Sequence, residues 1–157
     1  MTIYEQRLCE KQGELFEKSS DLPCSSALFI RRYMDGSTAR DQDLAAMYFD
    51  ASKESASSLF ESLVERYHDL TKRQGLHYPS CVLHWMGYIY RAWAILTHKS
   101  SSTIYESMKA EDLLPLYDSF HTFDPKYCVK RLQEIVEEKE GPALSDYEVY
   151  KTIKLGY

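Results

Sequence analysis

The run RAWAILTH places an arginine and a histidine, Arg91 and His98, where they could act together on a phosphodiester. An arginine holds a phosphate through two parallel hydrogen bonds, and a histidine that titrates near neutral pH can move the proton of a ribose hydroxyl. Because the two residues stand seven positions apart, a helix would place them on one face, roughly 10 Å from each other. That arrangement is compatible with metal-independent cleavage of RNA, provided that a bend or a second subunit brings both side chains to one phosphate.

A structural role also explains these two residues. Arg91 could neutralise a buried acid or bind tyrosine hydroxyls, and His98 could end a helix, where the helix dipole favours a cation. A third interpretation adds His84 and Tyr88, which share a helix face with Arg91 at steps of four and three residues. These three residues form a polar line on an otherwise apolar segment, and such a line can floor a pocket for a small ligand or a peptide.

Sequence signatures of metal and cofactor sites are missing from the chain. The five histidines contain no HxxxH pair, the four cysteines contain no CxxC pair, and neither a glycine-rich phosphate loop nor a GxSxG motif occurs. In the phrase HTFDP, Asp124 is better explained as the cap of the helix that Pro125 begins, and His121 as part of the preceding turn. We therefore expect no metal ion and no cofactor, and the sequence favours a non-catalytic role while leaving catalysis open.

The elements that position these residues are predicted from hydrophobic periodicity. The segment 79–98 holds both tryptophans, its apolar residues recur every three or four positions, and Pro79 fits the first turn of a helix. Because the polar line lies on its other side, this helix should be central and buried on most sides. A membrane span is disfavoured, since Arg91 would lie near the middle of the bilayer.

The remaining periodicity is helical as well. Residues 2–19 have the amphipathic pattern of a surface helix, and residues 53–74 carry one unbroken apolar stripe that ends at Gly75, a residue suited to a C-terminal cap. The short connection to the central helix predicts that these two helices pack antiparallel. A helix that begins near Ser37 is expected to turn three apolar side chains toward the core, namely Leu44, Met47 and Tyr48.

The chain is thus predicted to be an all-α, compact bundle of about seven to nine helices around the central buried helix. Its length of 157 residues fits one domain. We expect that domain to comprise residues 1–142, and residues 143–157 to form a short C-terminal helix or a tail.

Composition and charge favour a cytoplasmic protein that binds other proteins. The net charge of −5 argues against general nucleic-acid binding, which requires a basic surface. The charged N-terminal stretch is unlike a secretory signal, and scattered cysteines are typical of reduced thiols. Thirteen tyrosines favour an interaction surface, because tyrosine is enriched at protein interfaces. A homo-oligomer is compatible with this composition.

Four phrases in the chain, FIRRYM, WMGYIYRAW, SSTIYE and FHTFDP, occur in an order that resembles a family of small helical proteins from Firmicutes-type Gram-positive bacteria. The resemblance covers residues 3–137. Members of this family are similar to accessory proteins from toxin–antitoxin-like or mobile-element gene clusters, which implies binding to another protein, such as a cognate toxin. No activity is established for the family, so it assigns no catalytic residue. Ala92 departs from the family, in which an aromatic residue is usual at this position.

The spacing of Arg91 and His98 is also similar to the R-x(4–6)-H signature of HEPN-type ribonucleases, although Ala92 replaces the polar residue that usually follows the arginine. We favour a protein-interaction, antitoxin-like accessory factor. The alternatives are a HEPN-like ribonuclease toxin that uses Arg91 and His98, and a helical sensor of a small ligand that binds at His84, Tyr88 and Arg91.

Overall fold

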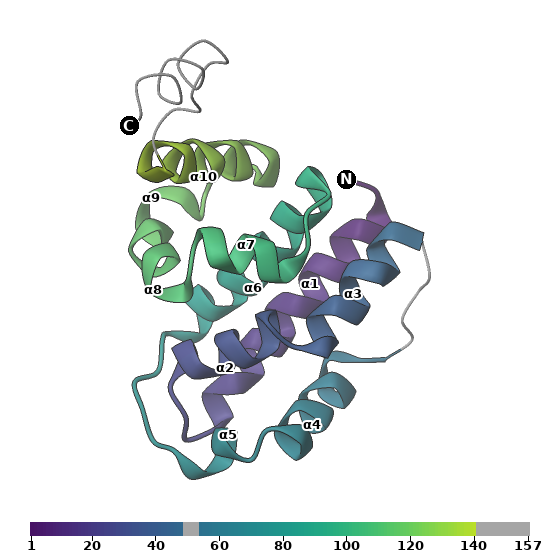
Figure 1. Cartoon of the computed structure of the whole chain (residues 1–157), viewed down its shortest axis with the longest axis vertical. Coiled ribbons are helices and arrows are strands. Elements are labelled where there is room, and N and C mark those ends of the chain that lie inside the picture. The colour runs from purple at the N-terminus through teal and green to yellow at the C-terminus, as the bar shows by residue number, and fades with distance from the viewer. Residues whose placement is uncertain (49–53, 141–157) are drawn as a thin grey trace, which may run out of the picture.

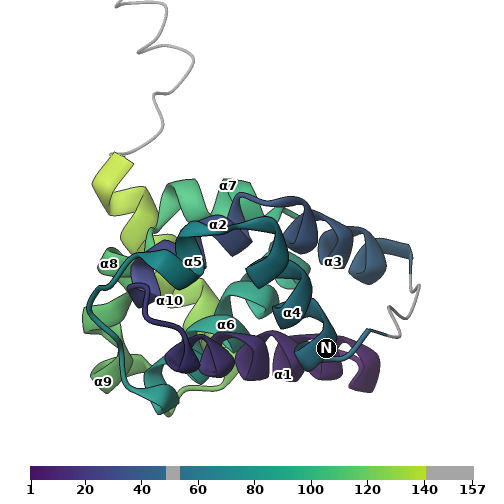
Figure 2. The same cartoon turned by 90° about the horizontal axis from the view of Figure 1, so that it is seen from below.

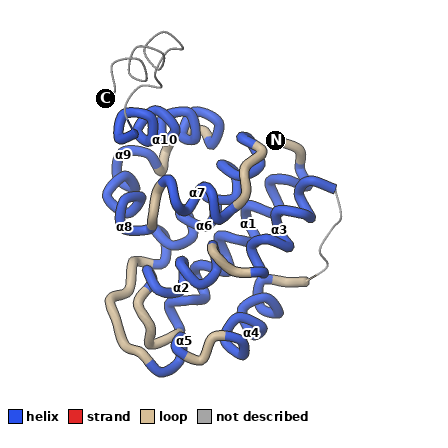
Figure 3. Tube along the Cα trace, viewed as in Figure 1, coloured by secondary structure: helices blue, strands red, loops and turns tan. Residues whose placement is uncertain are grey.

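The computed structural model of the protein describes residues 1–48 and 54–140, with the side chain of Tyr48 also left undescribed. Within these ranges the chain consists of helices and loops, without a strand, which confirms the all-α prediction (Figure 3). The segment 143–157, predicted as a helix or tail, lies outside the described residues. The α-helices are α1 (Ile3–Lys18), α2 (Ser26–Met34), α3 (Ser37–Tyr48), α4 (Ala56–Arg66), α5 (Asp69–Lys72), α6 (Ser80–Thr97), α7 (Ser101–Ser107), α8 (Ala110–Leu113), α9 (Tyr117–Phe120) and α10 (Pro125–Glu140), with 3-10 turns at Ser19–Asp21 and Leu114–Leu116.

Helix α6 is the centre of the bundle, as its sequence predicts. In Figure 2, α1 lies along one side of the molecule, α2, α3 and α7 lie along the other, and α6 runs between them. α10 packs against α6 from the end of the bundle where α8 and α9 lie (Figure 1). Eleven residues of α6 are buried, among them Trp93, Tyr90 and Arg91. None of the helices among the described residues is both long enough and apolar enough to cross a membrane.

The most extensive contact in the fold joins α6 to α1, and two glycines make it possible. A Cβ atom on Gly87 would lie 2.4 Å from the carbonyl oxygen of Gln12, and one on Gly13 would lie 2.9 Å from that of His84. The helix axes can therefore approach closely only because neither position has a side chain. α1 buries Leu15 and other apolar residues here, so it is a core element as well as the amphipathic helix that was predicted.

The predicted helix over 53–74 is divided in the structure. α4 ends at Arg66, Tyr67 adopts an extended conformation, and α5 follows as a single turn. The apolar stripe continues across the break to the buried Leu70, so periodicity alone could not reveal it. α4 packs on α1 rather than antiparallel to α6. Gly75 does not cap a helix, since α5 ends at Lys72. Its backbone N–H instead bonds to the carbonyl oxygen of Pro23 at 3.1 Å.

The orientation of α3 also differs from the prediction. Leu44 is 46% exposed and Met47 is 63% exposed, so these side chains do not enter the core. α3 instead turns Ala39 and Gln42 inward and brings Asp43 next to α6. The buried charge on α6 therefore sets the rotation of α3 and leaves its larger apolar residues at the surface.

Candidate functional site

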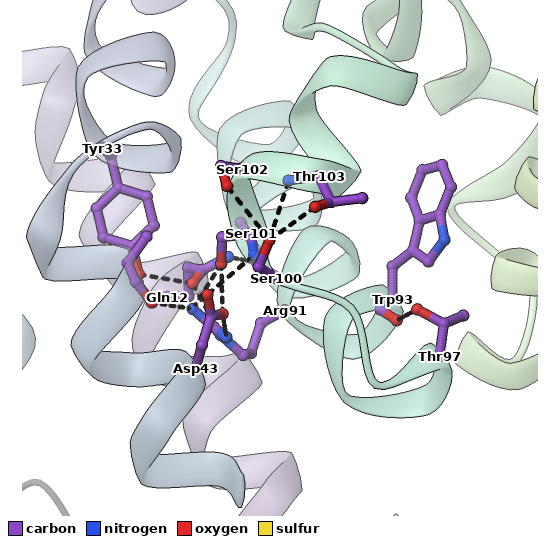
Figure 4. A network of polar contacts seen from close by, with 12 residues as sticks. Gln12, Tyr33, Asp43, Arg91, Trp93, Thr97, Ser100, Ser101, Ser102 and Thr103 are labelled. Carbon is purple, nitrogen blue, oxygen red and sulfur yellow. Dashed lines mark hydrogen bonds and ion pairs between the residues drawn. The ribbon is translucent and has the colours of Figure 1, made fainter.

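Arg91 lies in the second half of α6 with a side chain that is only 1% exposed. A buried guanidinium must be neutralised and hydrogen-bonded, because it loses its hydration. The structure provides partners from α1, α3 and α7 (Figure 4). Arg91 donates to Gln12 Oε1 (3.1 Å), Asp43 Oδ1 (2.5 Å), the carbonyl oxygen of Ala39 (3.3 Å) and Ser101 Oγ (3.2 Å).

Asp43 is the counter-charge of Arg91, and it also holds the start of α7. Its carboxylate accepts hydrogen bonds from the backbone N–H of Ser101 at 2.9 Å and from the Ser101 hydroxyl at 2.6 Å. Burial disfavours the charged form of Arg91, but the neighbouring Tyr33 and Asp43 outweigh this effect and raise the pKa of Arg91. The pair is therefore a fully formed ion pair inside the bundle.

Gln12 connects this ion pair to α1 and α2. Its Oε1 atom accepts from Arg91 and from the hydroxyl of Tyr33 at 2.6 Å, while its Nε2 atom donates to the carbonyl oxygen of Gly87 at 2.8 Å. Burial raises the pKa of Tyr33, so its hydroxyl stays protonated as a donor. We call this set the Arg91 network; its members are Gln12, Tyr33, Asp43, Arg91 and Ser101.

The Arg91 network and the carbonyl oxygen of Ala39 together occupy four of the five N–H donors that a guanidinium carries. This geometry agrees with the structural interpretation of Arg91 as the partner of a buried acid. His98 is exposed and ends α6 in a left-handed conformation, with φ 55°. The structure thus places Arg91 inside the bundle and His98 at its surface.

An apolar pocket of about 460 Å³ opens between α3 and the C-terminal half of α6, beside the Arg91 network. This volume falls in the range of pockets that bind ligands or anchor side chains. His98 and Arg91 both contribute to its lining. We call it the α3–α6 groove and define it by its apolar residues Leu44, Met47, Ala94 and Ile95 and its cations Arg40 and Lys99.

Three charged residues around the α3–α6 groove have no ion pair among the described residues: the cations Arg40 and Lys99 and the carboxylate of Glu5. Asp43 belongs to the Arg91 network, and Glu5 accepts the backbone N–H of Thr2 in the capping box of α1. Arg40 and Lys99 have no ion pair within residues 1–48 and 54–140. A ligand or partner that enters the groove would therefore meet an apolar floor and a rim on which the cations Arg40 and Lys99 outnumber the one unpaired carboxylate, Glu5.

The predicted polar line is divided between two places. Arg91 faces its network, whereas His84 and Tyr88 line a separate pocket of about 320 Å³ against α9 and the start of α10. His84 lies between two carboxylates, with Nδ1 2.6 Å from Glu17, out of hydrogen-bond alignment, and Nε2 3.4 Å from Glu10. No group of three metal-ligating side chains occurs among the residues that the structure describes.

The sequence analysis missed Asp43 and Gln12, which complete the Arg91 network. For Asp43 the apolar periodicity of α3 predicted another inner face, defined by Leu44 and Met47, whereas Gln12 lies on the apolar face of α1, four residues after Leu8. Asp43 could have been sought from the interpretation of Arg91 as the partner of a buried acid, because that interpretation requires a carboxylate on a neighbouring helix. The predicted cap at the start of α10 is confirmed, because Asp124 accepts the backbone N–H of Lys126 at 3.0 Å.

Comparison with known proteins gives no match, whether to a family, to a curated protein or to a solved structure. The resemblance of residues 3–137 to a Firmicutes-type family therefore stays a prediction, and the geometry of the chain itself must carry the functional argument.

Proposed function

We propose that the protein binds another protein, as an antitoxin-like accessory factor, and that the α3–α6 groove receives an amphipathic helix of this partner. The observation that carries the proposal is the exposure of Leu44 and Met47, which line an apolar pocket of about 460 Å³. Exposed apolar side chains that border a concavity are typical of interaction sites. A methionine at such a border also adapts to different side chains, because it is unbranched and flexible.

An amphipathic helix fits this groove because its apolar residues recur along one face and can enter a hydrophobic groove as anchors. Ala94 and Ile95 form the floor, with small and medium side chains that leave room for an inserted anchor. Fully buried anchors of this kind supply most of the binding energy at protein interfaces. We therefore expect one or two large apolar residues of the partner to occupy the pocket.

The rim of the groove determines the preferred charge of the partner. Arg40 and Lys99 are both exposed and have no described ion pair, so carboxylates beside the apolar anchors would find complementary charge. Complementary rim charges mainly raise the association rate and exclude unsuitable partners. The partner helix should accordingly carry Asp or Glu next to its apolar face.

The ribonuclease alternative requires Arg91 to hold a phosphate, and its guanidinium is already bound to Asp43, Gln12 and Ser101. Cleavage would need the Arg91 network to open. This alternative stays a prediction: purified protein should cleave RNA without a metal ion, and His98→Ala should abolish cleavage. The sensor alternative, in which His84, Tyr88 and Arg91 hold a small ligand together, likewise stays a prediction; it would need the Arg91 side chain to leave its network for the pocket that His84 and Tyr88 line.

The proposal can be tested by capture from cells with three tagged forms of the full chain. Met47→Glu places a carboxylate in the groove, while Leu76→Glu makes the same change at a residue that is 78% exposed and outside the groove. We expect one protein to be retained by the wild type and by Leu76→Glu, and to be lost with Met47→Glu. Equal retention by all three forms, or retention of nothing specific, contradicts the proposal.

A defined probe makes the test independent of the cellular partner. An amphipathic helical peptide with a leucine face and flanking glutamates should bind the wild type, while the same peptide with flanking lysines should bind more weakly. Arg40→Ala should reduce this difference, because it removes one cation of the rim. Equal binding of both peptides would contradict the charge preference.

A further inference from the structure

We infer that the N-terminal half of α6 carries a second site, which binds a small organic cation of the quaternary ammonium type. The site is the 320 Å³ pocket described above, which lies against α9 and α10 rather than α3. It does not depend on the proposed function, because the two pockets share no residue. We call it the aromatic pocket and define it by Trp85, Tyr88, Tyr117, His121, Phe123 and Glu10.

The aromatic rings form walls that meet at an angle. Trp85 and Tyr117 pack edge to face, with centroids 5.6 Å apart and planes inclined by 74°. His121 stacks on Tyr117 at 4.3 Å and 17°, and its Nδ1 atom donates to the carbonyl oxygen of Tyr117 at 2.7 Å, which fixes the ring. A compact group would therefore lie in the corner beside this edge-to-face pair, against the ring faces that the packing leaves free.

The aromatic pocket contains one carboxylate, that of Glu10, which lies 3.4 Å from Nε2 of His84. Glu10 lines it with a side chain that is 57% exposed, and no lysine or arginine lines it. Burial and the nearby Cys9, Glu10 and Asp124 raise the pKa of Tyr88, so its hydroxyl stays neutral. An anion would meet π faces and a carboxylate, both unfavourable to it, whereas a cation is attracted by both.

A quaternary ammonium group suits these walls better than an ammonium group. The faces of tryptophan, tyrosine and phenylalanine attract cations through their quadrupoles, and aromatic cages commonly recognise methylated ammonium groups. Such a group carries no N–H donor, so it loses no hydrogen bonds to water when it enters a pocket with few acceptors. The volume is near the lower end for ligand pockets, so we assign a free small molecule rather than a methylated lysine of a protein.

The test is a pair of calorimetric titrations of the full chain with choline and with its neutral carbon isostere, 3,3-dimethylbutan-1-ol. We expect choline to bind about 5- to 30-fold more tightly, which corresponds to about 1–2 kcal/mol of cation–π attraction. The measurement is made at about pH 8, above the range in which histidines ordinarily gain a proton. Equal binding of the two compounds, or no binding of choline, overturns the inference.

Two variants assign the binding to the aromatic pocket. Glu10→Gln removes the exposed carboxylate and should lower the choline affinity several-fold with an unchanged melting temperature. Trp85→Leu removes one wall and should abolish measurable binding. Met47→Glu, which alters the other pocket, should leave the choline affinity unchanged. Loss of choline binding in Met47→Glu, or full retention in Trp85→Leu as a folded protein, would contradict the assignment.

Cys81 supplies an independent readout that does not need calorimetry. It lines the aromatic pocket and is exposed, whereas Cys9, Cys24 and Cys128 are buried and burial raises the pKa of each thiol, to about 12 for Cys9 and Cys128. Alkylation by iodoacetamide should therefore start at Cys81, and choline should slow it while the neutral isostere should not.

A peptide with trimethyl-lysine separates the two sources of the same cation. If the peptide binds and choline does not, the pocket recognises a protein modification and the assignment to a small molecule is overturned. If choline binds at least as well as the peptide, the assignment is supported.

Discussion

The two halves of α6 use their polar residues in opposite ways. In the C-terminal half, Arg91 is matched by Asp43, Gln12 and Ser101, so the charge and the hydrogen-bonding groups are satisfied inside the protein. In the N-terminal half, the rings around Trp85 are only partly buried, and Glu10, which lies 3.4 Å from His84, keeps 57% of its side chain exposed. A satisfied network holds helices together, while an unsatisfied set of groups is available to a ligand. Of the candidate residues that the sequence indicates on α6, Arg91 is thus bound within the protein, while His84 and Tyr88 line the aromatic pocket.

The largest expected effect on stability comes from a substitution within the Arg91 network, in the C-terminal half of α6. Arg91→Ala removes the buried counter-ion of Asp43, whose carboxylate is only 16% exposed, and removing one partner of a buried ion pair costs about 3–5 kcal/mol. Urea denaturation should show this loss of unfolding free energy. Arg40→Ala, which removes an unpaired surface cation, should change it by less than about 0.5 kcal/mol. Similar losses for both variants would mean that the Arg91 network contributes little.

A somewhat smaller effect is expected where α1 and α6 touch. Gly87→Ala places a methyl group 2.4 Å from the carbonyl oxygen of Gln12. The helices must separate, which costs about 1–3 kcal/mol by overpacking and also strains the hydrogen bond from Gln12 to this turn. Thermal denaturation of Gly87→Ala measures the effect, and the exposed Ser80→Ala on the same helix is its control. Unchanged stability of Gly87→Ala would show that α1 can move away without cost.

A surface ion pair sharpens the comparison with the buried one. Arg32 bonds to Asp69 at 2.6 Å, and this hydrogen bond lowers the pKa of Asp69. A lowered carboxyl pKa contributes stability above the ordinary aspartate pKa, and that contribution is lost as the pH falls through the lowered value. Because both groups are partly exposed, a double-mutant cycle with Arg32→Ala and Asp69→Asn should give less than about 1 kcal/mol at neutral pH and none in acid. A coupling as large as that of Arg91 and Asp43 would contradict this distinction.

The smallest effect on stability is expected in the α3–α6 groove. Leu44→Ser and Met47→Ser alter side chains that are already exposed, so the unfolding free energy should change by less than about 0.5 kcal/mol. If either substitution destabilises the protein by several kcal/mol, these residues stabilise the fold, and the proposal that the groove is an interaction surface is contradicted.

The sequence predicted where the helices lie along the chain better than it predicted which side of each helix is buried. The central helix was predictable because its apolar residues recur without interruption and only its ends needed caps. The break at Tyr67 was not, since the apolar stripe passes through it. The rotation of α3 could not be predicted for a different reason. The buried Arg91 requires a counter-ion, and leaving it without one costs more free energy than leaving Leu44 and Met47 exposed. The aromatic pocket joins Glu10, Trp85 and Tyr117 from three separate helices, a proximity that no spacing within one helix encodes.

The most direct test is the equilibrium affinity of the captured partner protein for the purified wild type, Met47→Glu and Leu76→Glu, each checked by circular dichroism. The account predicts at least a tenfold weaker complex for Met47→Glu alone, with all three melting temperatures alike. Equal affinities for all three proteins would contradict binding through the α3–α6 groove.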